Sequence, residues 1–301
     1  MLKFPTRALF IEGPDCSGKT TLVKKIHRIS NYEWHIQDRS QISRKIFSDL
    51  YHRDIDNIDS DLHVEISNLN NRFILLLPEI GVVNKRFLER GDDFHKDLKS
   101  LGCVYDIFKD RFKSLRNLPN TMFYSRSETG EIASVVLARL HIVERCMIRE
   151  VSDQVLGFVE CNNNESYPLE FTLYDDGEFE EANEECLDYE PESNYYHEIF
   201  RKLHTTISDE LSGKNEYNRV ESSKSRRFIY TDNTCISFIQ VSIRDRVMDF
   251  HTVIRSTDVK NIFPHDLMFL YYLAYTCYNR FKEDCDNVRM RFNLNSSHII
   301  G

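Results

Sequence analysis

The feature that most constrains the fold is a glycine-rich segment near the N-terminus, Gly13-Pro-Asp-Cys-Ser-Gly-Lys-Thr20, which fits the pattern G-x-x-x-x-G-K-[ST]. An apolar run at 7–12 precedes this segment, and residues 19–29 follow it with apolar side chains three and four positions apart. Strand, glycine-rich loop and helix in this order form the context that the pattern requires. The segment predicts an α/β fold, because such a strand normally belongs to a parallel sheet flanked by helices.

The residue types in this segment predict a phosphate-binding loop. Glycines let backbone N–H groups close around phosphate oxygens, and the helix N-terminus adds a favourable dipole. We expect Lys19 to reach the β- and γ-phosphates of ATP and the Thr20 hydroxyl to be the Mg²⁺ ligand. The predicted ATP-binding residues are Gly13, Asp15, Ser17, Gly18, Lys19, Thr20 and Thr21. The alternative is a chance match in a tight turn.

Strand and helix patterns alternate through the first half of the chain. Short apolar runs predict strands at 34–37, 72–77 and 121–125, and helical spacing predicts helices at 41–51, 79–90, 94–115 and 131–149. Alternation of this kind indicates a parallel sheet with flanking helices, so residues 1–149 are predicted to form one domain.

Three motifs within residues 7–145 resemble thymidylate kinases and their deoxynucleoside-kinase relatives. Phe10-Ile-Glu-Gly-Pro-Asp-Cys-Ser-Gly-Lys-Thr-Thr21 is similar to the F-E-G-x-D-G-x-G-K-T-T opening of those enzymes. Asp38-Arg39-Ser40-x-x-Ser43-x-x-x-Phe47 looks like their D-R-[SY]-x-x-S-x-x-x-[YF] segment. A strand that ends in Pro78-Glu79, followed by Lys85-Arg86-x-x-x-Arg90-Gly91, is similar to their lid region. The resemblance implies a P-loop kinase that uses ATP and Mg²⁺.

This resemblance also implies roles for the charged residues. A phosphoryl group in transfer spreads negative charge over its oxygens, so several cations must converge on it. The implied catalytic residues are Lys19, Asp38, Arg39, Arg86 and Arg90, and Asp15 and Arg39 are implied to bind the acceptor. Asp38 could instead be a helix N-cap. Arg86 and Arg90 could instead form an ordinary basic helix face paired with Glu89 or Asp93.

The second half of the chain has a different pattern, and residues 150–301 are predicted to form another domain. Ten acidic residues fall within 175–192, which predicts a solvated loop or hairpin edge. Helices are predicted near 197–211 and at 265–282, with successive strands at 227–230, 235–243 and 247–254.

Short motifs in residues 225–299 resemble thymidylate synthase and the related deoxycytidylate hydroxymethylases. They are Ser225-Arg226-Arg227, Cys235-x-x-x-x-Gln240, Arg255-Ser256-x-Asp258-Val259, Phe263-Pro264-x-Asp266 and Ser296-Ser297-His298. The resemblance implies an α+β domain that binds a pyrimidine nucleotide and forms a homodimer.

Within that resemblance, Cys235 is implied to add to C6 of the pyrimidine, and Arg255, Ser256 and Asp258 to bind the nucleotide. Arg226 and Arg227 are implied to reach a phosphate across the dimer interface. Asp266, which replaces an asparagine of the synthases, is implied to accept a hydrogen bond from the N4 amine of cytosine. The alternatives are a buried strand cysteine at 235 and an unrelated surface acid at a helix start at 266.

The composition of the chain limits the kinds of partner and surroundings that it suits. The 39 Lys and Arg against 48 Asp and Glu give a net charge of −9, which does not favour nucleic acid as a partner. No apolar run approaches the roughly 20 residues that span a bilayer. Eight cysteines without a C-x-x-C pair indicate a cytoplasmic chain with reduced thiols. The pairing of the two resemblances implies a bacterial or virus-infected cell.

Taken together, the phosphate-binding loop and the two resemblances imply ATP-dependent phosphoryl transfer to a deoxynucleotide or modified pyrimidine nucleotide, with a nucleotide-binding C-terminal domain. Three alternatives remain open. The chain could be a pyrimidine C5 methyl or hydroxymethyl transferase that uses Cys235, a kinase of hydroxymethylated bases in DNA, or a P-loop binding module without an acceptor.

Overall fold

The computed structural model describes residues 2–91, 95–144, 146–166, 168–177, 194–211 and 227–300, and at 142–144, 194–195, 197–198, 210 and 227 the backbone alone. The chain divides into two compact units. An N-terminal unit comprises Thr6–Ile142, and a C-terminal unit comprises Met1–Pro5 together with Val143–Gly301. Along the chain, the boundary between the units falls between residues 142 and 143, earlier than the expected boundary at 149. The first residues join the second unit because Leu2–Lys3 pairs with one of its strands.

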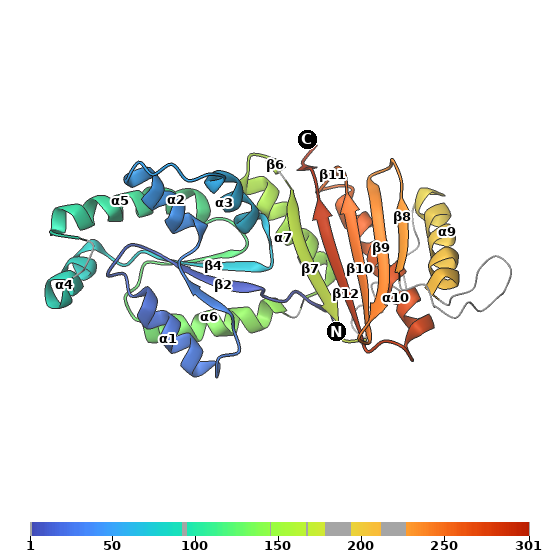
Figure 1. The fold of residues 1–301 in the computed structure, drawn as a ribbon, viewed down its shortest axis with the longest axis horizontal. Helices are drawn as coiled ribbons and strands as arrows, with labels where there is room; N and C mark the ends of the chain where they lie inside the picture. The colour runs from blue at the N-terminus through green and yellow to red at the C-terminus, as the bar shows by residue number, and fades with distance from the viewer. Residues whose placement is uncertain are drawn as a thin grey trace. The chain divides into compact units, whose positions relative to one another are not determined.

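The N-terminal unit is an α/β fold built on a four-stranded parallel sheet. Its strands lie in the order β3-β2-β4-β5, and helices cover both faces, with α1 and α6 on one side and α2, α3 and α5 on the other (Figure 1). The strands are β2 (Ala8–Glu12), β3 (Ile36–Asp38), β4 (Asn71–Leu76) and β5 (Thr121–Tyr124). The helices are α1 (Lys19–Ile29), α2 (Gln41–Leu50), α3 (Ile58–Ser67), α4 (Ile80–Arg90), α5 (Leu98–Leu115) and α6 (Thr129–Glu144). The prediction of a parallel sheet with flanking helices is confirmed.

Side chains alternate between the two faces of this sheet and form a core on each. On one face, Leu9 and Ile11 of β2 pack with the apolar sides of α1 and α6. On the other, the rings of Phe10 and Phe73 stack with centroids 5.1 Å apart. β2 and β4 are therefore buried on both faces, which explains why their sequences are continuously apolar.

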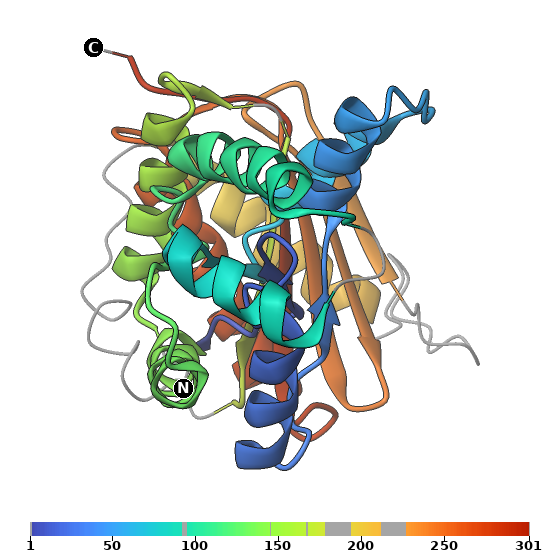
Figure 2. The same cartoon turned by 90° about the vertical axis from the view of Figure 1, so that its left-hand side faces the viewer.

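Two helices differ from the sequence prediction. Helix α3 lies in a stretch for which no element was predicted, and its mixed polar sequence explains the omission. The single helix predicted at 131–149 is wrong, because α6 ends at Glu144 and α7 (Ile148–Cys161) begins separately. The Glu150 carboxylate accepts a hydrogen bond from the Met147 N–H at 2.8 Å and so stabilises a new helix start. Figure 2 views the molecule from the side of α4 and α5.

The C-terminal unit is built on a six-stranded mixed sheet in the order β1-β7-β12-β10-β9-β8. Its strands are β1 (Leu2–Lys3), β7 (Leu169–Asp175), β12 (Asn287–Leu294), β10 (Val247–Ile254), β9 (Ile236–Arg244) and β8 (Arg227–Thr231). β10 and β12 run parallel, and the other neighbours are antiparallel. The predicted strands at 227–230, 235–243 and 247–254 correspond to β8, β9 and β10.

The helices of this unit are α7, α9 (Asn194–Leu211) and α10 (Phe263–Phe281). Buried and half-exposed residues alternate along β7, β10 and β12, so one face of the large sheet contributes to the core and the other does not. A small second sheet joins β11 (Thr257–Asp258), β13 (Ser297–His298) and β6 (Glu165–Ser166). Among the described helices, none is long and apolar enough to cross a membrane.

Most of the acidic stretch at 175–192 lies outside the described residues. Its first member, Asp175, is buried, in contrast to the predicted solvated loop. The carboxylate of Asp175 accepts hydrogen bonds from the Tyr271 hydroxyl at 3.0 Å and from the Gly177 N–H at 2.9 Å.

Candidate functional site

The predicted site residues of the N-terminal unit lie at the carboxyl edge of its sheet. β2 ends at Glu12 and leads into the glycine-rich loop, and β3 ends at Asp38. β4 leads into Pro78-Glu79, and β5 leads into the segment before α6. Because all four strands are parallel, these four connections meet at one edge, where open α/β sheets bind ligands.

The glycines of the loop occupy positions that exclude a side chain. Gly13 has φ +155°, and a Cβ there would lie 2.4 Å from the carbonyl oxygen of Leu76. Gly18 has φ +102°, and a Cβ there would lie 3.2 Å from Nη1 of Arg86. At Gly13 a side chain would collide with the backbone of β4, whereas at Gly18 the positive φ is the main reason that glycine is favoured.

Lys19 begins α1 and is buried inside the loop. Its Nζ donates hydrogen bonds to the carbonyl oxygens of Gly13 at 2.7 Å and Pro14 at 2.8 Å. Burial lowers the pKa of Lys19, and Asp15, whose Oδ1 lies 3.9 Å from Nζ, opposes this shift. The loop carbonyls thus hold the ammonium group at the centre of the predicted phosphate site.

Thr20 and Asp38 contact each other across the carboxyl edge. The Thr20 hydroxyl donates a hydrogen bond of 2.7 Å to Oδ2 of Asp38. The helix-cap alternative for Asp38 is wrong, because Ser40 is the N-cap of α2 and its hydroxyl accepts the Ile42 N–H at 3.0 Å. Asp38 therefore directs its carboxylate toward the loop.

Arg39 connects the end of β3 to the loop. Its Nη2 donates to Oδ1 of Asp15 at 2.6 Å, and its guanidinium lies 4.8 Å from the ring centroid of Phe47. Oδ2 of Asp15 lies 3.1 Å from Nε2 of His95, a residue that the motif analysis missed. Arg39 has φ +95°, a strained conformation for a non-glycine residue that often marks functional sites.

Glu12 is a second residue that the motif analysis did not assign to the site. It is 0% exposed, and its carboxylate accepts hydrogen bonds from the Ser40 N–H and the Ser43 hydroxyl, with the Ser43 N–H at 3.4 Å. Burial raises the pKa of Glu12, and the hydrogen bonds from Ser40 and Ser43 oppose that shift. Glu12 thus fixes the start of α2, and with it Asp38 and Arg39, against the base of the loop.

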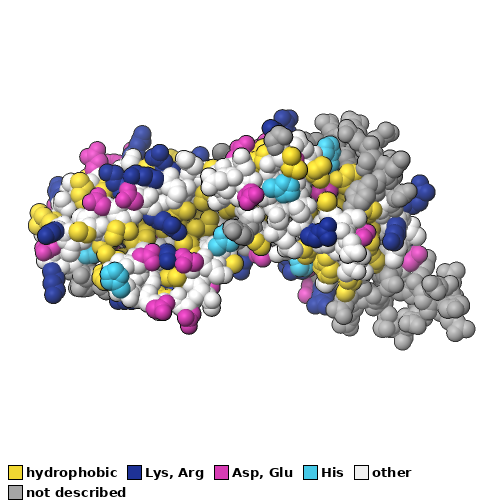
Figure 3. Space-filling view, turned by 90° about the horizontal axis from the view of Figure 1, so that it is seen from above, with side chains coloured by type: hydrophobic (Ala, Val, Ile, Leu, Met, Phe, Trp, Pro, Cys, Tyr) yellow, Lys and Arg dark blue, Asp and Glu magenta, His cyan; other side chains and the backbone are white. Residues whose placement is uncertain are grey.

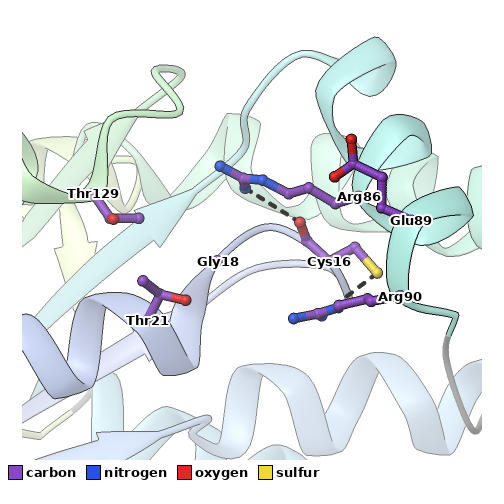
Figure 4. Close-up of a pocket in the computed structure, with 7 residues that line it drawn as sticks. All are labelled: Cys16, Gly18, Thr21, Arg86, Glu89, Arg90 and Thr129. Atoms are coloured by element: carbon purple, nitrogen blue, oxygen red, sulfur yellow. Dashed lines mark hydrogen bonds between the residues drawn. The ribbon is translucent and has the colours of Figure 1, made fainter.

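Arg86 and Arg90 lie on one face of α4 and point toward the loop (Figure 4). Nη1 of Arg86 donates to the carbonyl oxygen of Ser17 at 2.7 Å, and its Nη2 donates to that of Ser127 at 3.1 Å. Nη2 of Arg90 lies 3.6 Å from Sγ of Cys16. Glu89 pairs with Lys85, at 3.9 Å, rather than with either arginine, and Asp93, the other acid of the ion-paired alternative, lies outside the described residues.

A pocket opens between the loop and α4. It has a volume of about 310 Å³ and is lined by Cys16, Gly18, Thr21, Arg86, Glu89, Arg90 and Thr129 (Figure 4). The cationic groups of Lys19, Arg86 and Arg90 surround the loop, and this charge favours an anionic ligand.

The residues at the loop fit a nucleotide phosphate chain with Mg²⁺. The buried Ser17 hydroxyl has no hydrogen-bond partner among the described residues, so it is available to a phosphate oxygen. The Thr20 hydroxyl and Asp38 carboxylate supply the hard oxygen ligands that Mg²⁺ prefers. Within the described ranges, no cluster of three or more His, Cys, Asp or Glu could hold a metal by itself.

In the C-terminal unit, the structure brings several predicted residues together. Cys235 is exposed, and its carbonyl oxygen accepts the Arg255 N–H at 2.8 Å, so the two residues are neighbours. The segment Thr257–Asp258 pairs in parallel with Ser297–His298 in the small sheet. Because Cys235 is exposed, the alternative of a buried strand cysteine at 235 is wrong.

The two predicted nucleotide-binding acids of this unit are engaged by protein groups. Asp258 accepts hydrogen bonds from the Lys260 N–H at 3.1 Å and the Asn261 side-chain amide at 2.7 Å. Asp266 is 1% exposed and accepts a hydrogen bond from the Tyr196 hydroxyl at 2.7 Å. Burial raises the pKa of Asp266 to about 6. A nucleotide would have to displace Tyr196 to reach this carboxylate, and an exposed acid at a helix start is excluded.

Four further residues of this unit were predicted to contact a phosphate. Arg255 is exposed and Ser256 is half-buried beside it. Arg226 lies outside the described residues, and Arg227 begins β8 with its side chain not described. Their predicted contact with a partner phosphate stays a prediction.

Comparisons with known proteins found similarity among solved structures alone. No family model and no curated protein sequence matches the chain. Among solved structures, the chain is similar to thymidylate synthase from T4 phage, with 15% identity and a TM-score of 0.20. The similarity covers 40% of this chain and 46% of that synthase, so the match spans less than half of either protein. A TM-score at this level does not establish a shared fold.

Proposed function

We propose that the chain is an ATP-dependent kinase whose N-terminal unit transfers a phosphoryl group to a deoxynucleotide or a modified pyrimidine nucleotide. The observation that carries the proposal is the convergence of Lys19, Arg39, Arg86 and Arg90 on a glycine-rich loop at the carboxyl edge of a parallel sheet. Phosphoryl transfer depends mainly on positioning and on stabilising negative charge, and this cluster supplies both.

Each residue has a defined role in this proposal. Bound Mg²⁺, held by Thr20 and Asp38, would neutralise charge on the β- and γ-phosphates. Lys19 donates hydrogen bonds to those phosphates in place of the loop carbonyls it now contacts. Arg86 and Arg90 stabilise the charge that develops on the transferred group.

The acceptor side is formed by Asp38, Arg39 and Asp15. Oδ1 of Asp38 has no hydrogen-bond partner among the described residues, so it is available to accept the proton of the attacking hydroxyl. Glu12 holds this segment in place through Ser40 and Ser43. Asp15 orients Arg39 toward the loop by the 2.6 Å contact.

A small-molecule acceptor is favoured over DNA. On the face drawn in Figure 3, the described Lys and Arg side chains are interspersed with Asp and Glu and form no continuous basic band. The net charge of −9 points the same way, since binding to a phosphate backbone requires clustered positive charge.

The test is a screen of nucleosides, nucleoside monophosphates and duplex DNA with γ-labelled ATP. Lys19→Ala should lower phosphoryl transfer by about 10²-fold or more, whereas Lys24→Ala, an exposed lysine on the same helix, should leave it unchanged. The emission of Trp34, the single tryptophan, verifies the fold of the N-terminal unit. ATP binding without turnover on any acceptor would show a binding module instead.

For the C-terminal unit we propose binding of a pyrimidine nucleotide and dimer formation. Exposed Arg255 beside exposed Cys235 supports a phosphate contact next to a thiol. The same pair favours a second candidate, transfer of a one-carbon group to pyrimidine C5 by way of Cys235. Release of tritium from C5-labelled dUMP or dCMP would establish that activity, and its loss in Cys235→Ser would assign the nucleophile.

A further inference from the structure

The face of the six-stranded sheet that does not contribute to the core carries a group of charged side chains. Strand pairing places Asp249 of β10 beside Ser242 of β9 on one side and Arg289 of β12 on the other. Two residues further along β12, Arg291 points to the same face. Arg244 ends β9 on this face, next to Val247.

These side chains form a pocket rather than a flat surface. It has a volume of about 230 Å³, with Arg244, Arg289, Arg291, Asp249, Ser242 and Gln240 in its lining. Ser242 is buried and Asp249 is mostly buried, whereas the arginine side chains remain accessible at the rim. A pocket of this size suits a small anion or the phosphate portion of a larger molecule better than a whole nucleotide.

The charges in the pocket are not balanced. Asp249 accepts hydrogen bonds from Nε of Arg289 at 2.9 Å and from Nη2 of Arg291 at 2.6 Å. Burial would raise the pKa of Asp249, but these hydrogen bonds outweigh it and lower that pKa. The guanidinium of Arg244 is exposed and has no ion-pair or hydrogen-bond partner in the described part of the chain. Three arginines and one aspartate leave an excess of two positive charges in a chain of net charge −9.

We propose that this pocket is a second anion site, which binds a phosphate or diphosphate group between Arg244 and the outer edges of Arg289 and Arg291. The guanidinium groups offer N–H donors in pairs that match phosphate oxygens. Asp249 holds two of the three guanidinium groups in place before the ligand arrives, which lowers the cost of binding. The site is built from β9, β10 and β12, so it does not depend on the proposed kinase function (Figure 1).

The test measures binding of inorganic pyrophosphate by calorimetry to the full chain carrying Lys19→Ala, which weakens the glycine-rich loop as a competing site. Adding Arg244→Ala should weaken binding about tenfold or more, because it removes a charged donor without leaving a buried partner. The matched control is Arg201→Ala, which removes an exposed arginine from α9. It should leave the affinity unchanged.

A substitution that is expected to raise the affinity for pyrophosphate provides a second test. Asp249→Asn removes the negative charge but keeps an oxygen that can accept from Nε of both Arg289 and Arg291, so the two arginines stay in place and pyrophosphate should bind more tightly. Comparison of pyrophosphate with a nucleoside triphosphate distinguishes recognition of the phosphate chain from recognition of the whole nucleotide. Equal affinities for the Arg244 and Arg201 variants, or no binding of pyrophosphate, would overturn the proposal whether or not the chain is a kinase.

Discussion

Asp266 gives the most direct quantitative prediction, because its environment has a measurable consequence for stability. The residue lies in the first turn of α10, and burial raises the pKa of its carboxyl from 3.8 to about 6. The hydrogen bonds from Tyr196 and Thr257 and the nearby His265 oppose this shift. The folded state therefore holds a proton at this site over a range where the unfolded chain has released it.

The sign follows from proton linkage. Between about pH 4 and pH 6 the folded protein binds more protons at Asp266 than the unfolded chain, so the free energy of unfolding decreases as pH rises. A shift from 3.8 to about 6 corresponds to roughly 3 kcal/mol at about 1.4 kcal/mol for each pKa unit. This loss is complete above pH 6 and absent below pH 4.

The substitution Asp266→Asn isolates the contribution of this carboxyl group to the pH dependence of stability. The amide oxygen of asparagine can still accept the Tyr196 hydroxyl, and its NH₂ can donate to the Thr257 hydroxyl, which lies 3.5 Å from Oδ2. The variant should equal the wild type in stability below pH 4 and exceed it by up to about 3 kcal/mol above pH 6.

The assay is urea unfolding of the full chain at pH values from about 3.5 to 7.5, followed by circular dichroism. Emission from Trp34, the single tryptophan, is recorded in parallel, because Trp34 lies in the N-terminal unit and identifies the transition of that unit. The exposed Glu283→Gln, just after α10, changes the formal charge by the same amount and serves as the control. Parallel stability curves for wild type and Asp266→Asn between pH 4 and 6 would refute the reasoning.

Further predictions concern both units. Glu12→Leu should destabilise the N-terminal unit by about 2 kcal/mol or more, because the Ser40 N–H and the Ser43 hydroxyl would lose their acceptor at a buried site; unchanged unfolding by Trp34 emission would contradict this. Asp38→Asn should lower turnover by about 10²-fold or more with an unchanged melting temperature, since Ser40 caps α2. Cys235→Ser should leave phosphoryl transfer unchanged in the labelled-ATP assay. Sedimentation at micromolar concentration should show a homodimer, and a monomer would remove the proposed cross-interface phosphate contact.

The local elements of the N-terminal unit could be predicted because their signals lie within a few neighbouring residues. The sequence from Ala8 to Ile29 specifies strand, loop and helix through continuous apolar character, glycines at Gly13 and Gly18, and helical spacing. The parallel arrangement also followed, because alternating strands and helices connect most simply as a parallel sheet. The ends of successive parallel strands share one edge, which explains why Lys19 and Asp38, assigned to one site through the resemblance to thymidylate kinases, lie close together.

The tertiary structure decided the contacts between residues that no local pattern relates. His95 reaches Asp15 across 80 positions, and Tyr196 reaches Asp266 across 70. Periodicity reports which face of an element is apolar, but it does not report which other element will cover that face or which polar group will meet a buried carboxylate. The burial of Glu12 behind Ser43 and the pocket around Arg244 depend on strand order and on helix packing. They therefore emerge only when the chain has folded.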